Sequence, residues 1–168
     1  MQDARDTFFV NLRDRVAAGN AARTVVVRGV VRPAVVVVEN ELPAAAADGL
    51  SLVDTFCLRW TGVQVDGRGT RPLAAMLCEI RYATDGTVGN AGMDRGRMLA
   101  AMDAELLTAL GTAPRRVQKS TFVSGTATAL GTAVFWGDVK FEAVAAKGER
   151  LERVATVEVY SYGESGER

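Results

Sequence analysis

The 168-residue chain contains no histidine, and this absence excludes more kinds of site than any other feature of its composition. Ser-His-Asp and Cys-His catalytic arrangements and histidine-ligated zinc all need an imidazole ring. The commonest general base near neutral pH is also missing, because no other side chain titrates there unperturbed. The usual hydrolase designs are therefore excluded.

The chain also lacks net charge, because 20 Lys and Arg residues balance 20 Asp and Glu residues. Duplex nucleic-acid binding depends on a surplus of basic residues that neutralise phosphates. The balance therefore argues against a duplex binder. A zero net charge does not exclude local basic patches on the surface.

Cysteine is scarce, with Cys57 and Cys78 in separate apolar segments and no C-x-x-C spacing. We expect both to be small buried hydrophobic residues rather than metal ligands or a disulfide. No apolar run approaches the roughly 20 residues that span a bilayer. The first residues carry acid instead of the basic-then-apolar order of a signal peptide. We expect a protein that is made in a cytoplasm and does not enter membranes.

The first 40 residues predict a helix and then a valine-rich β region. Residues 3–18 place Phe9, Leu12 and Val16 on one stripe of an amphipathic helix, with Asp3 as its N-cap. Residues 24–39 are too rich in valine for a helix, and Gly29 and Pro33 divide them into two strands or one bent strand. The stretch 34–38 is apolar throughout, which predicts a central strand covered on both faces.

The rest of the chain predicts two long hairpins around a second helix. Strands over 55–65 and 73–83 flank a polar glycine-containing loop, Asp66 to Pro72, and strands over 133–144 and 151–162 form the second hairpin. Between them, residues 93–110 predict a helix with an apolar stripe, and residues 115–123 a strand. The stripe consists of Leu99, Met102, Leu106 and Leu110.

This order predicts the α+β class: a mostly antiparallel sheet with long hairpins, covered on one face by two helices. We expect one domain over residues 1–163 and a disordered tail over residues 164–168. Residues 40–54 predict a loop or a loose helical turn that carries no recognisable chemistry.

The motifs that carry chemistry are few. The loops DGRGT (66–70) and GTVGNAG (86–92) have neither the phosphate-loop order nor the dinucleotide fingerprint. The second loop precedes a helix, whose N-terminus could hold an anion, but a solvent loop that uses glycine for positive φ explains it as well. Lys119 is the only base near Ser120 and Ser124. We expect a protein that is not an enzyme, with no catalytic residue, cofactor or metal site.

Two basic clusters remain as candidate contact residues. Arg68 and Arg71 lie in the first hairpin loop, and Arg115, Arg116 and Lys119 follow the second helix. Such clusters keep a surface soluble. If they lined a channel they could instead follow a nucleic-acid backbone, although the interleaved aromatic residues of such grooves are missing.

The order of elements resembles a known family. An N-terminal amphipathic helix leads to RPAVVVVE (32–39), a hairpin ends in LCEIRYATDG (77–86), and MLAAMDAELLTAL (98–110) forms a helix before ATVEVYSYGE (155–164) closes the chain. This pattern is similar to the tail terminator, or tail completion, proteins of tailed bacteriophages and phage-tail-like contractile machines. The resemblance covers most of the chain and rests on element order.

The resemblance implies a subunit of a hexameric ring that caps the tail tube, ends its polymerisation and joins it to the neck or capsid. The implied partners are further copies of the chain, the tail tube protein, a neck or connector protein and, in a contractile tail, the sheath protein. DNA would pass through the ring lumen without sequence-specific binding. The implied location is the head-tail junction of the virion, after assembly in the host cytoplasm.

By position, we assign the loops Asp66 to Pro72 and Ser124 to Thr132 to ring or tube contacts, with Arg68, Arg71, Arg115, Arg116 and Lys119 as interface residues. A sheet with only two helices, carrying Trp60, Phe135 and Trp136, would also leave apolar surface for a neighbouring subunit to bury. Two alternatives stay open. One is a head-tail connector or neck subunit; the other is a small ligand-binding or enzymatic α+β domain.

Overall fold

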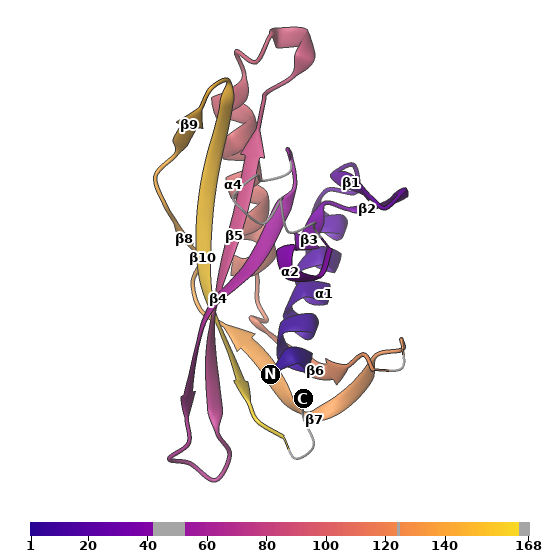
Figure 1. Cartoon of the computed structure of the whole chain (residues 1–168), viewed down its shortest axis with the longest axis vertical. Coiled ribbons are helices and arrows are strands. Elements are labelled where there is room, and N and C mark those ends of the chain that lie inside the picture. The colour runs from indigo at the N-terminus through magenta and orange to yellow at the C-terminus, as the bar shows by residue number, and fades with distance from the viewer. Residues whose placement is uncertain (42–52, 124, 165–168) are drawn as a thin grey trace.

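The computed structural model describes residues 1–41, 53–123 and 125–164, and these form an α+β fold (Figure 1). The main sheet has the strand order β3-β4-β5-β10-β7-β6, and two short strands, β8 and β9, also pair with β10. Its strands are β3 (Val35–Val37), β4 (Phe56–Asp66), β5 (Leu73–Thr84), β6 (Arg116–Thr121), β7 (Thr128–Trp136), β8 (Lys140–Phe141), β9 (Ala145–Lys147) and β10 (Arg150–Tyr162).

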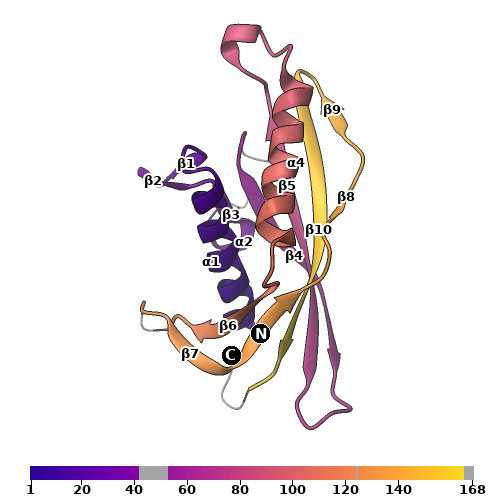
Figure 2. The same ribbon diagram turned by 180° about the vertical axis from the view of Figure 1, so that it is seen from behind.

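Two long helices, α1 (Gln2–Gly19) and α4 (Arg95–Gly111), lie on one face of this sheet, as Figure 2 shows from behind. The predicted fold class is confirmed. The sheet is mixed rather than wholly antiparallel, because β3 runs parallel to β4.

The hydrophobic core lies between the two helices and the sheet. The predicted stripe of α4, from Leu99 to Leu110, is buried as expected. On α1 the buried stripe is Phe8, Leu12 and Val16, so Phe8 takes the place that we assigned to Phe9, which is only partly buried. The rings of Phe8 and Trp136 meet edge to face with centroids 5.7 Å apart. Burial of these side chains supplies the main driving force for folding.

The start of α1 differs from the prediction. Asp3 lies inside the first turn and Met1 is the N-cap residue, so the predicted N-cap at Asp3 is wrong. An acid in the first turn still interacts favourably with the helix dipole. The helix ends near Gly19, and the N–H of Asn20 donates to the carbonyl of Val16 at 2.8 Å.

The valine-rich region forms three strands rather than one or two. β1 (Thr24–Val27) and β2 (Val30–Pro33) form a separate two-stranded hairpin, and β3 follows. The turn residues Arg28 and Gly29 both have positive φ, which a two-residue hairpin turn of this twist requires.

β3 is buried on both faces, as predicted, yet it lies at the edge of the main sheet rather than in its centre. Val35 and Val37 face the main core. On the opposite face Val36 packs with Cys57 under Val25 and Val27 of β1. The β1–β2 hairpin therefore covers the second face of β3, where the sequence predicts cover from a central position in the sheet.

Polar contacts hold α4 against the strands. The hydroxyl of buried Tyr82 donates to the Asp103 carboxylate, which also pairs with Arg153 of β10 at 3.2 Å. The indole N–H of Trp136 donates to the carbonyl of Leu110 at 2.9 Å, close to the end of the helix. These contacts fix the position of α4 over β5, β7 and β10.

The second hairpin is interrupted. β10 is continuous, but its predicted partner over 133–144 is divided between the end of β7 and β8, and β9 follows it in the predicted connection. All three strands pair with parts of β10. The expected loop from Ser124 to Thr132 is also partly strand, because β7 begins at Thr128; Ser124 itself lies outside the described residues.

The remaining expectations concern the segment 40–54 and the tail. A four-residue helix, α2 (Val38–Glu41), starts at the last residue of the predicted strand and includes the first two residues of this segment; residues 42–52 lie outside the described part. Of the expected tail, residues 165–168 also lie outside it, whereas Glu164 makes hydrogen bonds with β7. Cys57 and Cys78 are both buried thiols, as expected. Within the described residues no helix is long and apolar enough to cross a membrane.

Candidate assembly surface

The β4–β5 hairpin projects beyond the ends of both helices, together with the end of β10 (Figures 1 and 2). β4 and β5 pair from Cys57↔Arg81 to Asp66↔Leu73, with an irregularity in register between Trp60 and Gly62. From Thr61 to Pro72 every residue is exposed. We call residues 61–77 the projecting hairpin; its β4 side and its loop are exposed, whereas Ala74 and Met76 of β5 are buried.

One face of the projecting hairpin continues the core face of the sheet. Val63 lies opposite Met76, and Val65 opposite Ala74. Met76 and Ala74 are buried, whereas Val63 and Val65 are 47% and 52% exposed. Because side chains alternate along a strand, both valines point to the side on which the helices lie, but past the ends of those helices.

The other face carries Leu77 and a group of aromatic rings. Phe135 and Tyr160 stack with their centroids 5.4 Å apart, and Tyr162 lies 6.3 Å from Phe135. Leu77 and Tyr162 are exposed. The Tyr160 hydroxyl donates to Glu158, and this hydrogen bond raises the pKa of the tyrosine. Aromatic residues with a polar end are enriched where proteins meet one another.

The outer edge of β4 is open along the projecting hairpin. β3 pairs with β4 only from Phe56 to Leu58, and the N–H of Trp60 donates to the Glu39 carboxylate at 2.9 Å. Among the described residues no strand pairs with this side of β4 beyond that point. An unpaired strand edge is a template for pairing with another chain.

The opposite edge of the sheet is covered by α1. The Thr7 hydroxyl accepts the N–H of Ser120 at 3.0 Å and lies 3.1 Å from the carbonyl oxygen of the same residue in β6. A helix side chain thus occupies the backbone N–H and carbonyl of one residue of that edge strand, Ser120. The two edges of the sheet therefore differ in their capacity to accept a further strand.

A second exposed apolar patch lies on the β1–β2 hairpin, well away from the projecting hairpin (Figure 1). Val26 and Val31 are directly opposite each other and are each 65% exposed. Val30, beside the turn, is 62% exposed. We call these three residues the valine patch. The subunit thus carries two different apolar surfaces at two different places.

The predicted contact residues Arg68 and Arg71 lie at the tip of the projecting hairpin and are exposed. Arg68 pairs with Asp66 at 2.9 Å, and its hydrogen bonds lower the pKa of that carboxyl group. Arg71 lines an open hollow with Pro72 and Glu164. Both side chains are accessible to a partner.

The second basic cluster does not form one surface. Arg115 and Arg116 are exposed, and Arg115 pairs with Asp138. Lys119 is fully buried, so its assignment to an exposed interface is wrong. Its ammonium group lies under the end of β10 and donates to the carbonyl of Tyr162 at 2.6 Å. Burial follows from strand alternation, because Lys119 shares the inward face of β6 with Val117, which packs against the core.

The glycine-containing loop before α4 is occupied by a carboxylate of the chain itself. Asp94 accepts hydrogen bonds from the Thr87 hydroxyl and from the Thr87 N–H, the latter at 2.9 Å. These bonds lower the pKa of Asp94 to about 2. A bound anion would meet this negative charge, which favours the interpretation as a structural loop.

Sequence reasoning missed the exposure of Val63, Val65 and the valine patch. The alternation in 61–66 shows an apolar strand face, but nothing in the pattern shows that the helices end before they reach it. The described residues contain no group of three acids or cysteines that could hold a metal ion. The chain matches no protein-family model and no curated protein sequence.

Proposed function

We propose that the protein is a structural ring subunit of a phage tail or phage-tail-like machine, with the role of a tail terminator. The observation that carries this proposal is the projecting hairpin, which exposes apolar side chains on two faces and one open strand edge. The surface of a monomeric protein rarely presents a strand of this kind. A neighbouring subunit would bury it.

The two separate apolar surfaces support a ring rather than a two-fold dimer. A heterologous contact joins one patch of a subunit to a different patch of the next, and it closes into a ring when the rotation permits. The projecting hairpin and the valine patch are two such surfaces on one chain. The neutral net charge means that subunits do not repel one another strongly.

The resemblance to tail terminators supports the placement of the ring in a phage tail. The elements that carry the resemblance follow one another as α1, β3, the β4–β5 hairpin, α4 and β10. In this role the ring caps the tail tube and presents its other side to a neck or connector protein, and to the sheath in a contractile tail. DNA passes through the lumen.

The first experiment determines the mass of the purified protein by size exclusion with light scattering, and its shape by negative-stain imaging. We expect rings with a central hole that bind the ends of tail tubes. A protein that stays monomeric, alone and with tubes, would contradict the proposal. Rings that bind only the portal side of the neck would instead favour the connector role.

Two double variants test the heterologous contact. Val63→Asp with Val65→Asp damages only the projecting hairpin, and Val26→Asp with Val31→Asp damages only the valine patch. We expect neither variant to form rings alone. In an equimolar mixture, the intact valine patch of the first variant can bind the intact projecting hairpin of the second. We expect this mixture to form dimers that grow no further, because each dimer has no second intact pair of surfaces. Dimers formed by the valine-patch variant alone would show that the hairpin pairs with itself.

The matched control for both variants is Leu107→Asp. Leu107 is 52% exposed, as Val65 is, but it lies on α4 and on neither surface. This variant is expected to form rings like the unaltered protein. Loss of rings in the control would show that any added surface charge prevents assembly, and the comparison would then not locate the contact.

A further inference from the structure

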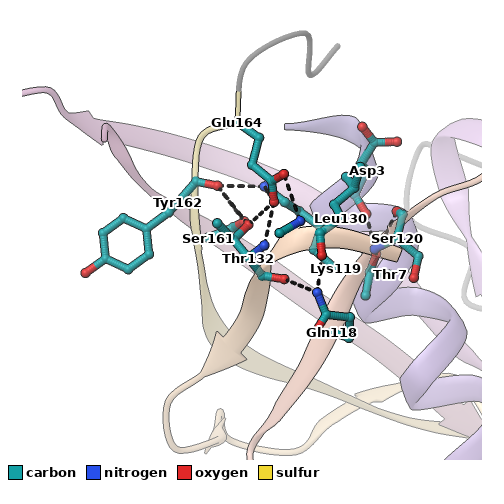
Figure 3. A network of polar contacts seen from close by, with 11 residues as sticks. Asp3, Thr7, Gln118, Lys119, Ser120, Leu130, Thr132, Ser161, Tyr162 and Glu164 are labelled. Carbon is teal, nitrogen blue, oxygen red and sulfur yellow. Dashed lines mark hydrogen bonds and ion pairs between the residues drawn. The ribbon is translucent and has the colours of Figure 1, made fainter. Parts of the chain in front are cut away.

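The carboxylate of Glu164 lies in a set of donors supplied by β6 and β7 (Figure 3). One oxygen accepts the N–H of Gly131 at 3.0 Å, and the other accepts the N–H of Thr132 at 2.7 Å together with the Thr132 hydroxyl. The Lys119 ammonium group lies 3.7 Å from the second oxygen. We call these donors, from Lys119, Gly131 and Thr132, the carboxylate cradle.

The cradle matches the chemistry of a carboxylate closely. Two backbone N–H groups of consecutive residues and a hydroxyl give both oxygens a donor, and charge-assisted hydrogen bonds of this kind are the strong ones. The cation behind them is fully buried. A buried ammonium group without a counter-charge is costly, so an emptied cradle would favour the return of an anion.

The segment that fills the cradle is short. Glu164 is the second residue after β10 ends at Tyr162, and between them the Gly163 N–H donates to the Pro72 carbonyl at 2.8 Å. An open hollow reaches the cradle from solvent, and the exposed Arg71 lines it. An acidic peptide thus has a cationic path to the same donors.

We propose that the carboxylate cradle is a binding site for a carboxylate on a peptide, which Glu164 fills within the subunit and which an acid from another chain can fill in its place. The ligand class is a glutamate or aspartate side chain in an extended segment. The proposal goes beyond the ring, because it concerns a site within one subunit, and its test does not require assembly.

The test uses the full chain with Glu164→Ala, which empties the cradle. We expect this variant to unfold at a lower temperature than the unaltered protein. Sodium acetate is expected to raise the unfolding temperature of the variant in a saturable manner, measured against sodium chloride at equal ionic strength. A synthetic peptide of residues 161–168 is expected to do the same at lower concentration, and the peptide with Glu164→Gln and Glu167→Gln is not.

Two controls locate the effect. The unaltered protein has a filled cradle and is expected to gain nothing from acetate beyond the chloride response. Lys119→Met with Glu164→Ala removes the buried cation while an unbranched apolar side chain fills its space, and this variant is also expected to lack the acetate response. An equal response in all three proteins, or none in Glu164→Ala, would overturn the proposal.

A measurement on the unaltered protein keeps the test decisive if Glu164→Ala does not fold. The carboxyl carbon of Glu164, followed by NMR as the pH changes, is expected to titrate below the usual range of glutamate. The hydroxyl of Thr132 is the main cause, and Lys119 adds to it. A Glu164 that titrates as an ordinary surface glutamate would also overturn the proposal.

Discussion

The N–H of Gly163 donates to the carbonyl oxygen of Pro72 at 2.8 Å, which ties the end of the last strand to the tip of the projecting hairpin. Gly163 is also tightly packed there, since a Cβ atom at this position would lie 2.9 Å from Cγ of Pro72. Gly163 is therefore packed directly against the loop of the projecting hairpin. A change at either end is expected to alter the other.

The variant Gly163→Ala tests this link. The added carbon cannot fit unless the proline ring or the strand end moves, so we expect a loss of about 1–3 kcal/mol in the free energy of unfolding. Chemical denaturation gives that value. Gly67→Ala is the matched control, because it lies in the same hairpin loop with open space around its Cβ position. Equal stability of the two variants would contradict the tight contact.

The packing of α4 is tested by two adjacent leucines. Leu106 is fully buried, whereas Leu107 is 52% exposed. We expect Leu106→Ala to lower the free energy of unfolding by about 2–5 kcal/mol, because it leaves a cavity beneath the helix. Leu107→Ala is expected to cost less than about 1 kcal/mol. A loss below that value for Leu106→Ala would show that the helix does not pack on the sheet through this face.

The cradle also predicts a pH dependence of stability. Hydrogen bonds from Thr132 hold the pKa of Glu164 below its ordinary value of 4.5 in the folded protein. A depressed pKa stabilises the folded state above the ordinary value, and this contribution is lost as the pH falls through the folded pKa. The stability difference between the unaltered protein and Glu164→Gln is therefore expected to be largest above pH 4.5 and to shrink in acid. A difference that does not change with pH would argue against a bound carboxylate.

The hairpin tip predicts a separation between folding and assembly. Arg68 and Arg71 are exposed, and Arg68 pairs with Asp66, two residues before it in the same loop. Replacing both arginines by serine is expected to change the free energy of unfolding by less than about 0.5 kcal/mol, because surface pairs contribute little. We expect the same variant to impair ring formation or tube binding, measured by sedimentation with tubes. The control Arg13→Ser removes a partly exposed arginine of α1 that pairs with Asp14. Normal rings and normal tube binding of the serine variant would remove the loop from the contact surface.

The elements with strong periodicity could be predicted from the sequence. The stripe from Leu99 to Leu110 has helical spacing, and the strands around the loop Asp66 to Pro72 have an alternation that only a pleated strand explains. The predicted bounds of α4 differ from the observed ones by two residues at one end and one residue at the other. These patterns depend on residues that are close in the sequence, and the structure contains the corresponding helix and strands.

The features that depend on distant contacts could not be predicted. The position of β3 at the sheet edge depends on the β1–β2 hairpin folding over it, and nothing in a run of valines distinguishes this cover from that of neighbouring strands. Lys119 belongs by sequence to a basic surface cluster, yet the end of β10 covers it. The exposure of Val63 and Val65 depends on where the helices end in space.

Negative-stain imaging of the purified full chain, with its mass measured by light scattering in the same preparation, tests the central claim most directly. The account predicts closed rings with a central hole, whose mass is a whole multiple of the 17.9 kDa subunit and which disappear in the Val63→Asp, Val65→Asp variant. A monodisperse 17.9 kDa particle that remains so at high concentration and beside tail tubes would contradict it.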